Sequence, residues 1–177
     1  MIRSHGMKSR QAKQYADKSC IGSGFHLPEK WFTLCAMEIS VVIPVRNRPE
    51  EIGRSVVAAL TSGRAAGFSD EQFEVIVVDN GSTDATAQRA REAGARVVSE
   101  TPPSRTRARN RGAREARGAW VAFLDSDCEA DPQWLGALAG KIRELEEAGV
   151  RAGAIAGAVR DAEPKTVVMA YLSRRRW

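Results

Sequence analysis

The stretch ISVVIPVRNRP (residues 39–49) decides the fold class, because it has the pattern of a buried strand that leads directly into a helix. ISVVI (39–43) is an almost unbroken run of branched apolar residues, which is typical of a strand buried on both faces of a sheet. We expect this strand to stop at Pro44, and Pro49 is well placed in the first turn of a helix. Apolar residues at helical spacing predict that the helix continues to Gly63.

The same succession of strand and helix repeats three more times along the chain. Apolar runs predict strands at 73–78, 95–99 and 119–124, and helical periodicity predicts helices from a cap at 82–84 to Gly94, over 105–118, and from Asp131 to about Glu147. Ala108, Gly112 and Ala116 form a stripe of small residues that allows the second of these helices to approach a sheet closely. GAIAGAV (153–159) is a candidate for one further strand. Short connections between buried strands predict an α/β fold with a mostly parallel sheet and helices on both faces.

Length and composition exclude several classes of protein. The chain has 177 residues and 43% hydrophobic content, which suits one core, and it contains no apolar run of the roughly 18 residues that a membrane span needs. The first 38 residues lack the pattern of a signal peptide. Three cysteines without CxxC spacing favour neither a disulfide framework nor a zinc site, so we expect a cytoplasmic protein.

The net charge of +5 comes from the two ends of the chain. Residues 1–38 hold six Lys or Arg against three acids and residues 171–177 hold three Arg, so residues 39–170 are close to neutral. Solvated basic tails explain this pattern better than a nucleic-acid surface, and we expect no nucleic-acid partner. Because His5 and His26 both lie in the first segment, the chemistry of the remainder must rely on carboxylates, arginines and backbone groups.

Polar side chains gather where the predicted strands end. Arg46 and Asn47 follow the first strand, Asp79 and Asn80 the second, and Asp125 and Asp127 the fourth. In open α/β sheets, ligands bind beyond the carboxyl ends of the strands. An arginine-rich helix opens just after the third strand, so carboxylates and arginines should meet at one edge of the sheet. This combination suits an anionic ligand held together with Mg²⁺ or Mn²⁺.

Several of these residues also have a simpler structural interpretation. Asp131 is best explained as a helix cap, Asp79 is equally well explained by the Asn-Gly turn beside it, and the arginine helix by a solvated face. Asp125 and Asp127 are harder to explain in this way, because two neighbouring acids without a counter-charge repel each other and a cation relieves the repulsion. The chain has no GxxxxGK[ST] and no GxGxxG, so the P-loop and dinucleotide fingerprints are absent.

Three motifs in order carry a resemblance to a known family. ISVVIPVRNRPEEIGRSVVAAL (39–60), FEVIVVDNGSTDAT (73–86) and ARNRGAREARGAWVAFLDSDCEADPQWL (108–135) resemble the nucleotide-binding half of the family 2 glycosyltransferases. The resemblance spans about residues 39–160 and implies the Rossmann-like GT-A fold of nucleotide-diphospho-sugar transferases.

The resemblance also implies roles for individual residues. Asp125-Ser126-Asp127 matches the DxD-type motif of the family, which makes Asp127 the expected ligand of Mn²⁺ or Mg²⁺ and Asp125 the expected contact on the ribose side of the donor. Arg109 lies in ARNRG, which matches the ARNxG of the family, and is expected to face the donor.

The expected base pocket of the donor departs from the family pattern. By resemblance, Asp79 would accept the N–H of the base, and Pro44, Val45 and Arg46 would line its pocket. However, Val45-Arg46 stands where the family usually has a small residue and Tyr, and Asn80 stands where it often has a second Asp. The resemblance favours a uridine nucleotide. The departures lie in the pocket that would recognise its base, so they bear on the identity of the nucleotide.

The expected activity is metal-assisted, inverting transfer of a sugar from a nucleotide-diphospho-sugar, most simply a UDP-sugar, to the hydroxyl of a saccharide or lipid-linked acceptor. Members of the family carry the catalytic base in a C-terminal half, so no residue of this chain is assigned as that base. Because the chain stops at Trp177, we expect it to be truncated. The alternative is a nucleotide-sugar-binding module without turnover.

Three segments are therefore expected. Residues 1–38 form an N-terminal extension outside the fold, 39–160 form the nucleotide-sugar-binding GT-A domain, and 161–177 are the start of a missing acceptor half or a basic tail. The end of the chain, TVVMAYLSRRRW (166–177), is either an exposed cut edge or an interfacial anchor that makes peripheral contact with the inner face of a membrane.

Overall fold

One mixed sheet forms the centre of the molecule. The structure, a computed structural model, describes residues 2–3, 38–150, 152, 154, 155 and 157. Its strands are β1 (Ile2–Arg3), β2 (Ile39–Val45), β3 (Phe73–Asp79), β4 (Arg96–Ser99) and β5 (Trp120–Phe123), and its helices are α2 (Pro49–Ala65), α3 (Thr86–Glu92), α4 (Arg105–Glu115) and α5 (Trp134–Glu147). The strand order is β1-β5-β2-β3-β4, and every pair is parallel except the antiparallel pairing of β1 with β5.

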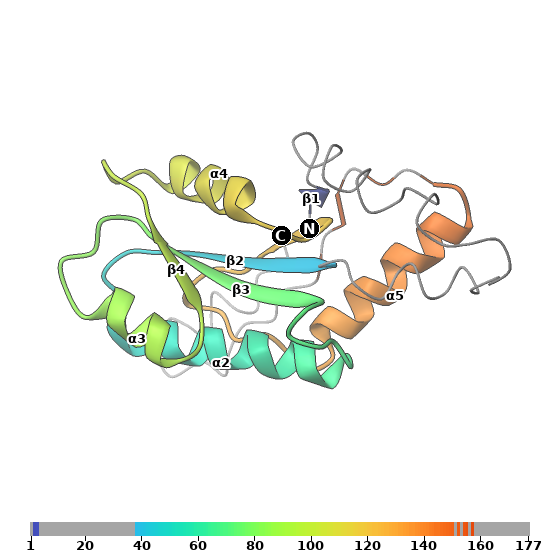
Figure 1. Cartoon of the computed structure of the whole chain (residues 1–177), viewed down its shortest axis with the longest axis horizontal. Helices are drawn as coiled ribbons and strands as arrows, with labels where there is room; N and C mark the ends of the chain where they lie inside the picture. Colours follow the sequence, from blue (N-terminus) through green and yellow to red (C-terminus); the bar gives the residue numbers. More distant parts are fainter. Residues whose placement is uncertain (1, 4–37, 151, 153, 156, 158–177) are drawn as a thin grey trace, which may run out of the picture.

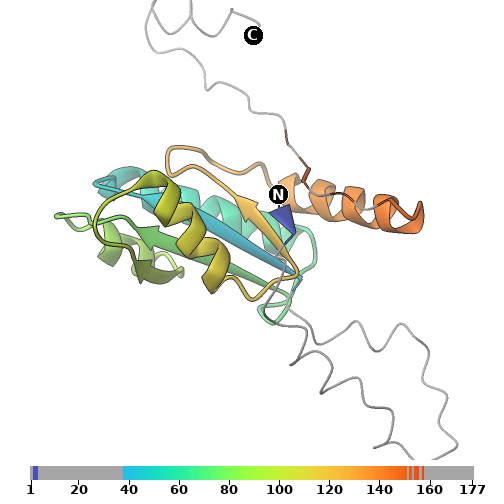
Figure 2. The same ribbon diagram turned by 90° about the horizontal axis from the view of Figure 1, so that it is seen from above.

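The helices lie on both faces of the sheet, as the sequence predicts. Figures 1 and 2 show α4 on one face and α2 and α3 on the other, with α5 extending beside the end of α2. The core has two parts because side chains alternate along each strand. Alternate residues of β2 and β3 pack with α2 and α5, whereas Val42, Ile76 and Val78 pack with Ala108 of α4 and with Ala116 at its C-cap.

The first strand is longer than expected. β2 runs through Pro44 to Val45, and both residues pair with β3, opposite Val78 and Asp79. A proline is tolerated in a strand where its missing N–H is not needed for pairing. The backbone carbonyl of Val42 faces β5 and accepts from Leu124 N. Pro44, two residues later, faces the same side, where β5 has already ended, so its missing N–H breaks no pairing. The prediction that the strand stops at Pro44 is therefore wrong.

Two helix boundaries also need comment. Pro49 begins α2 as predicted, but α4 ends at Glu115 rather than at Gly118. The backbone after Ala116 is extended, because Gly118 must pass directly over the start of β2. A Cβ on Gly118 would lie 2.6 Å from Ser40 N, so only glycine allows this approach.

The small-residue stripe of α4 brings the helix onto the sheet, as predicted. Ala108 is fully buried, and a Cβ on Gly112 would lie 2.2 Å from Val42 Cγ1. The helix backbone therefore packs directly on the Val42 side chain of β2, with no side chain of α4 between them. This contact fixes the height of α4 above the sheet.

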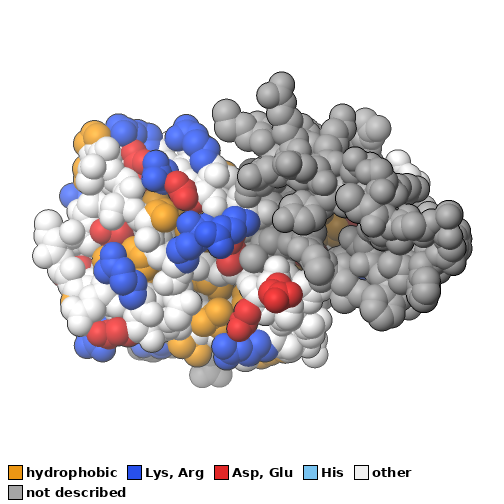
Figure 3. Space-filling view, in the orientation of Figure 1, with side chains coloured by type: hydrophobic (Ala, Val, Ile, Leu, Met, Phe, Trp, Pro, Cys, Tyr) orange, Lys and Arg blue, Asp and Glu red, His pale blue; other side chains and the backbone are white. Residues whose placement is uncertain are grey.

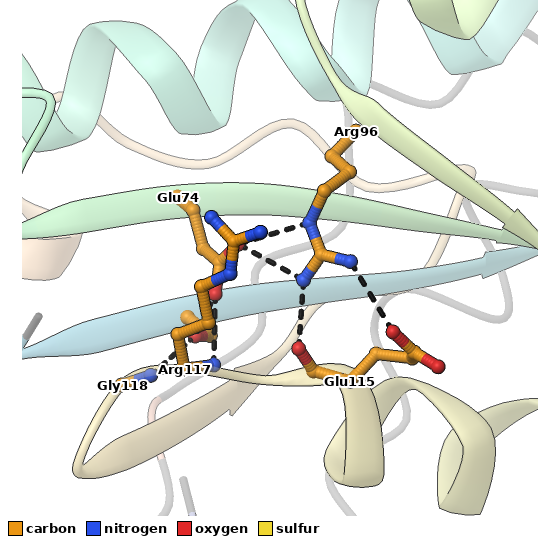
Figure 4. A network of polar contacts seen from close by, with 6 residues as sticks. Glu74, Arg96, Glu115, Arg117 and Gly118 are labelled. Carbon is orange, nitrogen blue, oxygen red and sulfur yellow. Dashed lines mark hydrogen bonds and ion pairs between the residues drawn. The ribbon is translucent and has the colours of Figure 1, made fainter. Parts of the chain in front are cut away.

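A polar network holds the C-terminal end of α4 (Figure 4). Arg96 of β4 contacts Glu74 of β3 through Nη2 at 3.0 Å, and the same nitrogen donates to the Glu115 carbonyl at 2.7 Å. Glu74 Oε1 accepts from Arg117 N at 2.9 Å and from Ser40 Oγ at 2.8 Å. The Glu74 side chain is only 11% exposed, so these partners compensate its loss of hydration.

Several expectations fall largely outside the described residues. Ile2–Arg3 pairs with Trp120 and Val121 and adds an edge strand that the sequence analysis did not predict, while residues 4–37 and 158–177 are not described. Of the candidate strand at 153–159, Ala154 forms an isolated bridge. No helix in the described part of the chain is long and apolar enough to cross a membrane.

Replacement of Gly112 by alanine tests the contact between α4 and β2. The new methyl group would overlap the buried Val42 side chain, so Gly112→Ala should lower the free energy of unfolding by about 1–3 kcal/mol despite the better helix propensity of alanine. Gly53→Ala in α2 is the control, because nothing lies within 4 Å of its added Cβ, and it should be neutral or stabilising. Urea denaturation measures both, and equal stabilities would contradict the contact.

Candidate functional site

The predicted site residues come together at the carboxyl edge of the sheet. The parallel register places Val45 opposite Asp79, and β5 ends on the other side of β2, next to Val42. Asp125 follows one residue after Leu124, whose N–H completes the pairing with β2. The residues predicted from the ends of three separate strands therefore lie on one edge, because neighbouring parallel strands end on the same side.

Asp79 is held in place by the turn that follows it. It is only 8% exposed, and its Oδ1 accepts from Ser82 N at 3.1 Å. The turn interpretation of Asp79 is therefore confirmed. Among the described residues, no other hydrogen bond to the Asp79 side chain is found, so its second oxygen is available to a ligand.

Asn80 connects β3 to the beginning of α4. Its Oδ1 accepts from Ser104 N at 2.7 Å, and Ser104 in turn caps α4 by accepting from Arg107 N. The Asn80 side chain is 7% exposed. Where the family often has a second Asp, this chain thus uses an amide to position the arginine-rich helix.

The loops after β2 and β3 interlock, which sequence reasoning missed. Asn47 N donates to Ser82 Oγ at 3.0 Å, and Thr83 N donates to Asn47 Oδ1 at 3.0 Å. Arg48 N adds a bond to Thr86 Oγ1 at 2.9 Å. Asn47 has φ of 50°, a conformation that asparagine tolerates better than most residues. The sequence offered one sign of this contact: Asn47 follows one predicted strand, and Ser82 and Thr83 follow the next.

Asp125 forms an ion pair with Arg109. Arg109 Nη2 lies 2.7 Å from Asp125 Oδ1, and their side chains are 42% and 60% exposed. Asp125 and Asp127 were expected to be two acids without a counter-charge, and for Asp125 this expectation is wrong. The pair is open to solvent, so screening makes it weak enough to exchange for a ligand.

Asp127 is the free carboxylate of the motif. It is exposed, and within the described part of the chain its side chain accepts only a long contact of 3.9 Å from Cys128 Sγ. The loop around it is fixed, because Ser126 O accepts from Ser55 Oγ of α2 at 2.9 Å and Cys128 N donates to Asp125 O at 3.0 Å. Partial burial, and then the charges of Asp127 and Asp125, raise the pKa of the Cys128 thiol.

The acids beyond the motif have structural roles. Asp131 Oδ1 accepts from Gln133 N at 2.8 Å and so fixes the turn before α5. The prediction that Asp131 caps the helix is wrong, because α5 begins at Trp134 and its N-cap is Gln133, which makes no side-chain cap bond. Glu129 forms an exposed ion pair of 3.2 Å with Arg54 of α2.

The side chains fit a cation that is shared with a ligand. In the described residues, no group of three or more His, Cys, Asp or Glu side chains could hold a metal ion. Mg²⁺ and Mn²⁺ are commonly held by one or two carboxylates together with the phosphate oxygens of a substrate. Asp127 could supply one such carboxylate, and Arg109, which is paired with Asp125 of the same loop, could meet the phosphate.

The parallel sheet with helices on both faces matches the structures of GT-A glycosyltransferases. The structure of residues 1–349 of S. aureus TarS in complex with UDP aligns with a TM-score of 0.53 and 30% identity over 62% of this chain and 33% of that chain. Residues 40–170 match the family Glycosyl transferase family 2, and the chain belongs to this family.

Two curated relatives show how much of the family this chain spans. Glycosyltransferase AglE from Haloferax volcanii is 37% identical over 55% of this chain and 33% of its own length. Glucosyl-3-phosphoglycerate synthase from Mycolicibacterium paratuberculosis is 39% identical over 63% of this chain and 35% of its own length. The chain therefore spans about a third of each relative.

Alkylation of Cys128 tests the charge around the motif. In a protein whose Cys20 and Cys35 are replaced by Ser, iodoacetamide should react slowly with Cys128 at pH 8, because a raised pKa keeps the thiol protonated. Asp127→Asn removes one of the charges that raise the pKa and should speed the reaction about twofold or more. Asp131→Asn is the control. An unchanged rate in Asp127→Asn would show that the carboxylate does not act on the thiol.

Proposed function

We propose that this chain forms the donor-binding part of a family 2 glycosyltransferase that moves a sugar from a UDP-sugar to an acceptor hydroxyl with a divalent cation and inversion. The observation that carries the proposal is the arrangement of Arg109, Asp125 and Asp127 at the carboxyl edge, where one acid is paired and the other is free. Membership of the family and the likeness to TarS in complex with UDP support it.

The base and ribose of the donor would lie over the ends of β2 and β3. The second oxygen of Asp79 can accept the N–H of uracil, and the half-buried Pro44 at the end of β2 offers an apolar wall. Val45, which was expected to line the same pocket, is only 3% exposed and packs in the core, so it would not contact the base. Arg46, which is exposed at the same edge, has no ring to stack on the base and instead brings a positive charge and five N–H donors. Recognition of the base would therefore rest more on polar contacts than in relatives with Tyr here.

The diphosphate would lie between Arg109 and Asp127. A divalent cation, Mn²⁺ or Mg²⁺, held by Asp127 would neutralise charge that develops on the leaving diphosphate. Arg109 can donate to a phosphate oxygen while it keeps or exchanges its bond to Asp125. If it exchanges that bond, Asp125 becomes free to accept from a ribose hydroxyl, which explains why the ligand-free pair is exposed rather than buried.

The acceptor and the catalytic base are not assigned to residues of this chain. An inverting transfer needs a carboxylate to remove the proton of the acceptor hydroxyl, and each acid described at this edge is either paired or placed for the donor. Because the chain spans about a third of its relatives, the proposed saccharide or lipid-linked acceptor would be bound by a further part of the protein.

Titration calorimetry with UDP tests the donor site. UDP should bind in the presence of Mn²⁺ or Mg²⁺ and weakly with a chelator. Asp127→Asn should reduce the metal-dependent affinity about tenfold or more, because it removes the only protein ligand proposed for the cation. Asp131→Asn should bind like the unchanged protein, because the Oδ1 of Asn can accept the same bond from Gln133 N. Equal affinity of Asp127→Asn would refute the metal assignment.

A nucleotide-sugar-binding module without turnover is the second candidate. One observation favours the binding module: every described acid at the edge already has a contact or a role at the donor, which leaves no residue for the catalytic base. Release of UDP from a UDP-sugar on addition of an acceptor separates the two functions. Donor binding without acceptor-dependent release, in a protein extended to the length of its relatives, would leave only the binding function.

A further inference from the structure

A groove between α4 and the end of β4 adjoins the donor edge, because Ser99 pairs with Asp79, but it is lined by a different set of side chains. Its volume is about 550 Å³, and it is lined by 99–101 at the end of β4 and by Arg107, Asn110, Arg111 and Arg114 of α4. Cavities of this size accommodate small molecules. None of these side chains is among the proposed donor contacts, since Arg109 points to Asp125 instead. Figure 3 shows basic side chains gathered over this part of the surface.

The arginines of the groove are not simply solvated. Arg107 Nη2 lies 2.8 Å from Glu100, whose side chain is 12% exposed, and 3.2 Å from Thr101 O. Arg111 Nη2 lies 3.0 Å from Glu115, a carboxylate that also contacts Arg96. These contacts hold two guanidinium groups at the groove before any ligand arrives. Each guanidinium has five N–H donors, so most donors stay available after the pairing.

The groove carries an excess of positive charge. Three arginines line it against one glutamate. Including Glu115, Glu74 and Arg96 from the neighbouring network, the arginines still exceed the glutamates by one. The excess belongs to Arg114, for which no ion pair is found among the described residues. An anion that entered the groove could therefore pair with Arg114 without displacing a carboxylate from it.

Arg111 provides a second and independent sign of a missing partner. Its Nε is enclosed and has no hydrogen-bond acceptor, and it is the only such buried side-chain atom in the described part of the chain. An enclosed donor without an acceptor is unfavourable, and native proteins rarely keep one without a reason. A small rotation of the Arg111 side chain toward the groove would present this N–H to an incoming oxygen.

We propose that this groove binds the phosphate group of a small molecule. Arg111 and Arg114, one turn apart on α4, would each donate to the phosphate oxygens, and Asn110 would add an amide donor. Arg107, fixed by Glu100, would bound the site on the side of β4. Phosphate suits these groups because the planar guanidinium fork matches its oxygens, and a dianion can accept from two arginines at once. The site is separate from the proposed donor site and would add a second anionic ligand to the same helix.

Titration of the full chain with inorganic phosphate and with pyrophosphate tests the groove. Amide NMR shifts or calorimetry should show saturable binding, with the largest changes at the groove residues. Arg111→Gln and Arg114→Gln should each weaken binding about tenfold or more, as expected for loss of a hydrogen bond to a charged group. Arg91→Gln, on the exposed side of α3, is the matched control and should bind normally. Thermal unfolding confirms that each variant is folded.

Competition separates this site from the donor site. Saturation with UDP and Mn²⁺ should leave phosphate binding in the groove in place, and Asp127→Asn should bind phosphate like the unchanged protein. Displacement of phosphate by UDP, or equal binding by Arg114→Gln and Arg91→Gln, would overturn the proposal. Binding only to anionic vesicles or to nucleic acid, without saturation by phosphate, would overturn it as well. Because the readout is phosphate binding rather than transfer, the proposed function can fail while this inference holds.

Discussion

The direct contact between the backbone of α4 and strand β2 governs the arrangement of the polar edge. At Gly112 no side chain separates the helix from Val42, so the helix sits low on the sheet. Arg109, one turn earlier on α4, can then reach Asp125 at the end of β5. At the other end of the helix, Arg96 holds the Glu115 carbonyl, which stops α4 from sliding along the sheet (Figure 4). The packing at Gly112 and the hydrogen bond from Arg96 thus position Arg109 at the polar edge.

Two sides of α4 carry arginine for different reasons. Arg109 faces the carboxyl edge, where an exposed ion pair with Asp125 is weak and can be exchanged for a phosphate oxygen. Arg107 and Arg111 face β4, where glutamates hold them at the groove. A helix with this much charge would repel itself in isolation. It is stable here because its inner face is made of small residues that pack without a gap on the sheet.

The loops of the donor edge derive their shape from contacts between segments that are distant in the sequence. Asn47 and Ser82 are 35 residues apart and bind each other through backbone and side chain. Asn80 and Ser104, 24 residues apart, connect β3 to α4. Such bonds restrict the backbone around the proposed base pocket before a ligand binds, which lowers the entropy cost of binding.

The sequence by itself determined four of the five strands, their parallel direction, the close approach of α4 and the family, because branched apolar runs, small-residue spacing and the DSD and ARNRG motifs are local signals. The order of the strands in the sheet and the edge strand β1 became known only from the tertiary structure. The sequence did not determine that Pro44 belongs to β2 or that α4 ends at Glu115. Nor did it determine that Arg109 forms an ion pair with Asp125 and not with Asp127. Those outcomes depend on where β5 stops and on which residues face each other across the sheet. The groove beside β4 was equally hidden, since it is formed by a strand end and a helix face that only the tertiary structure brings together.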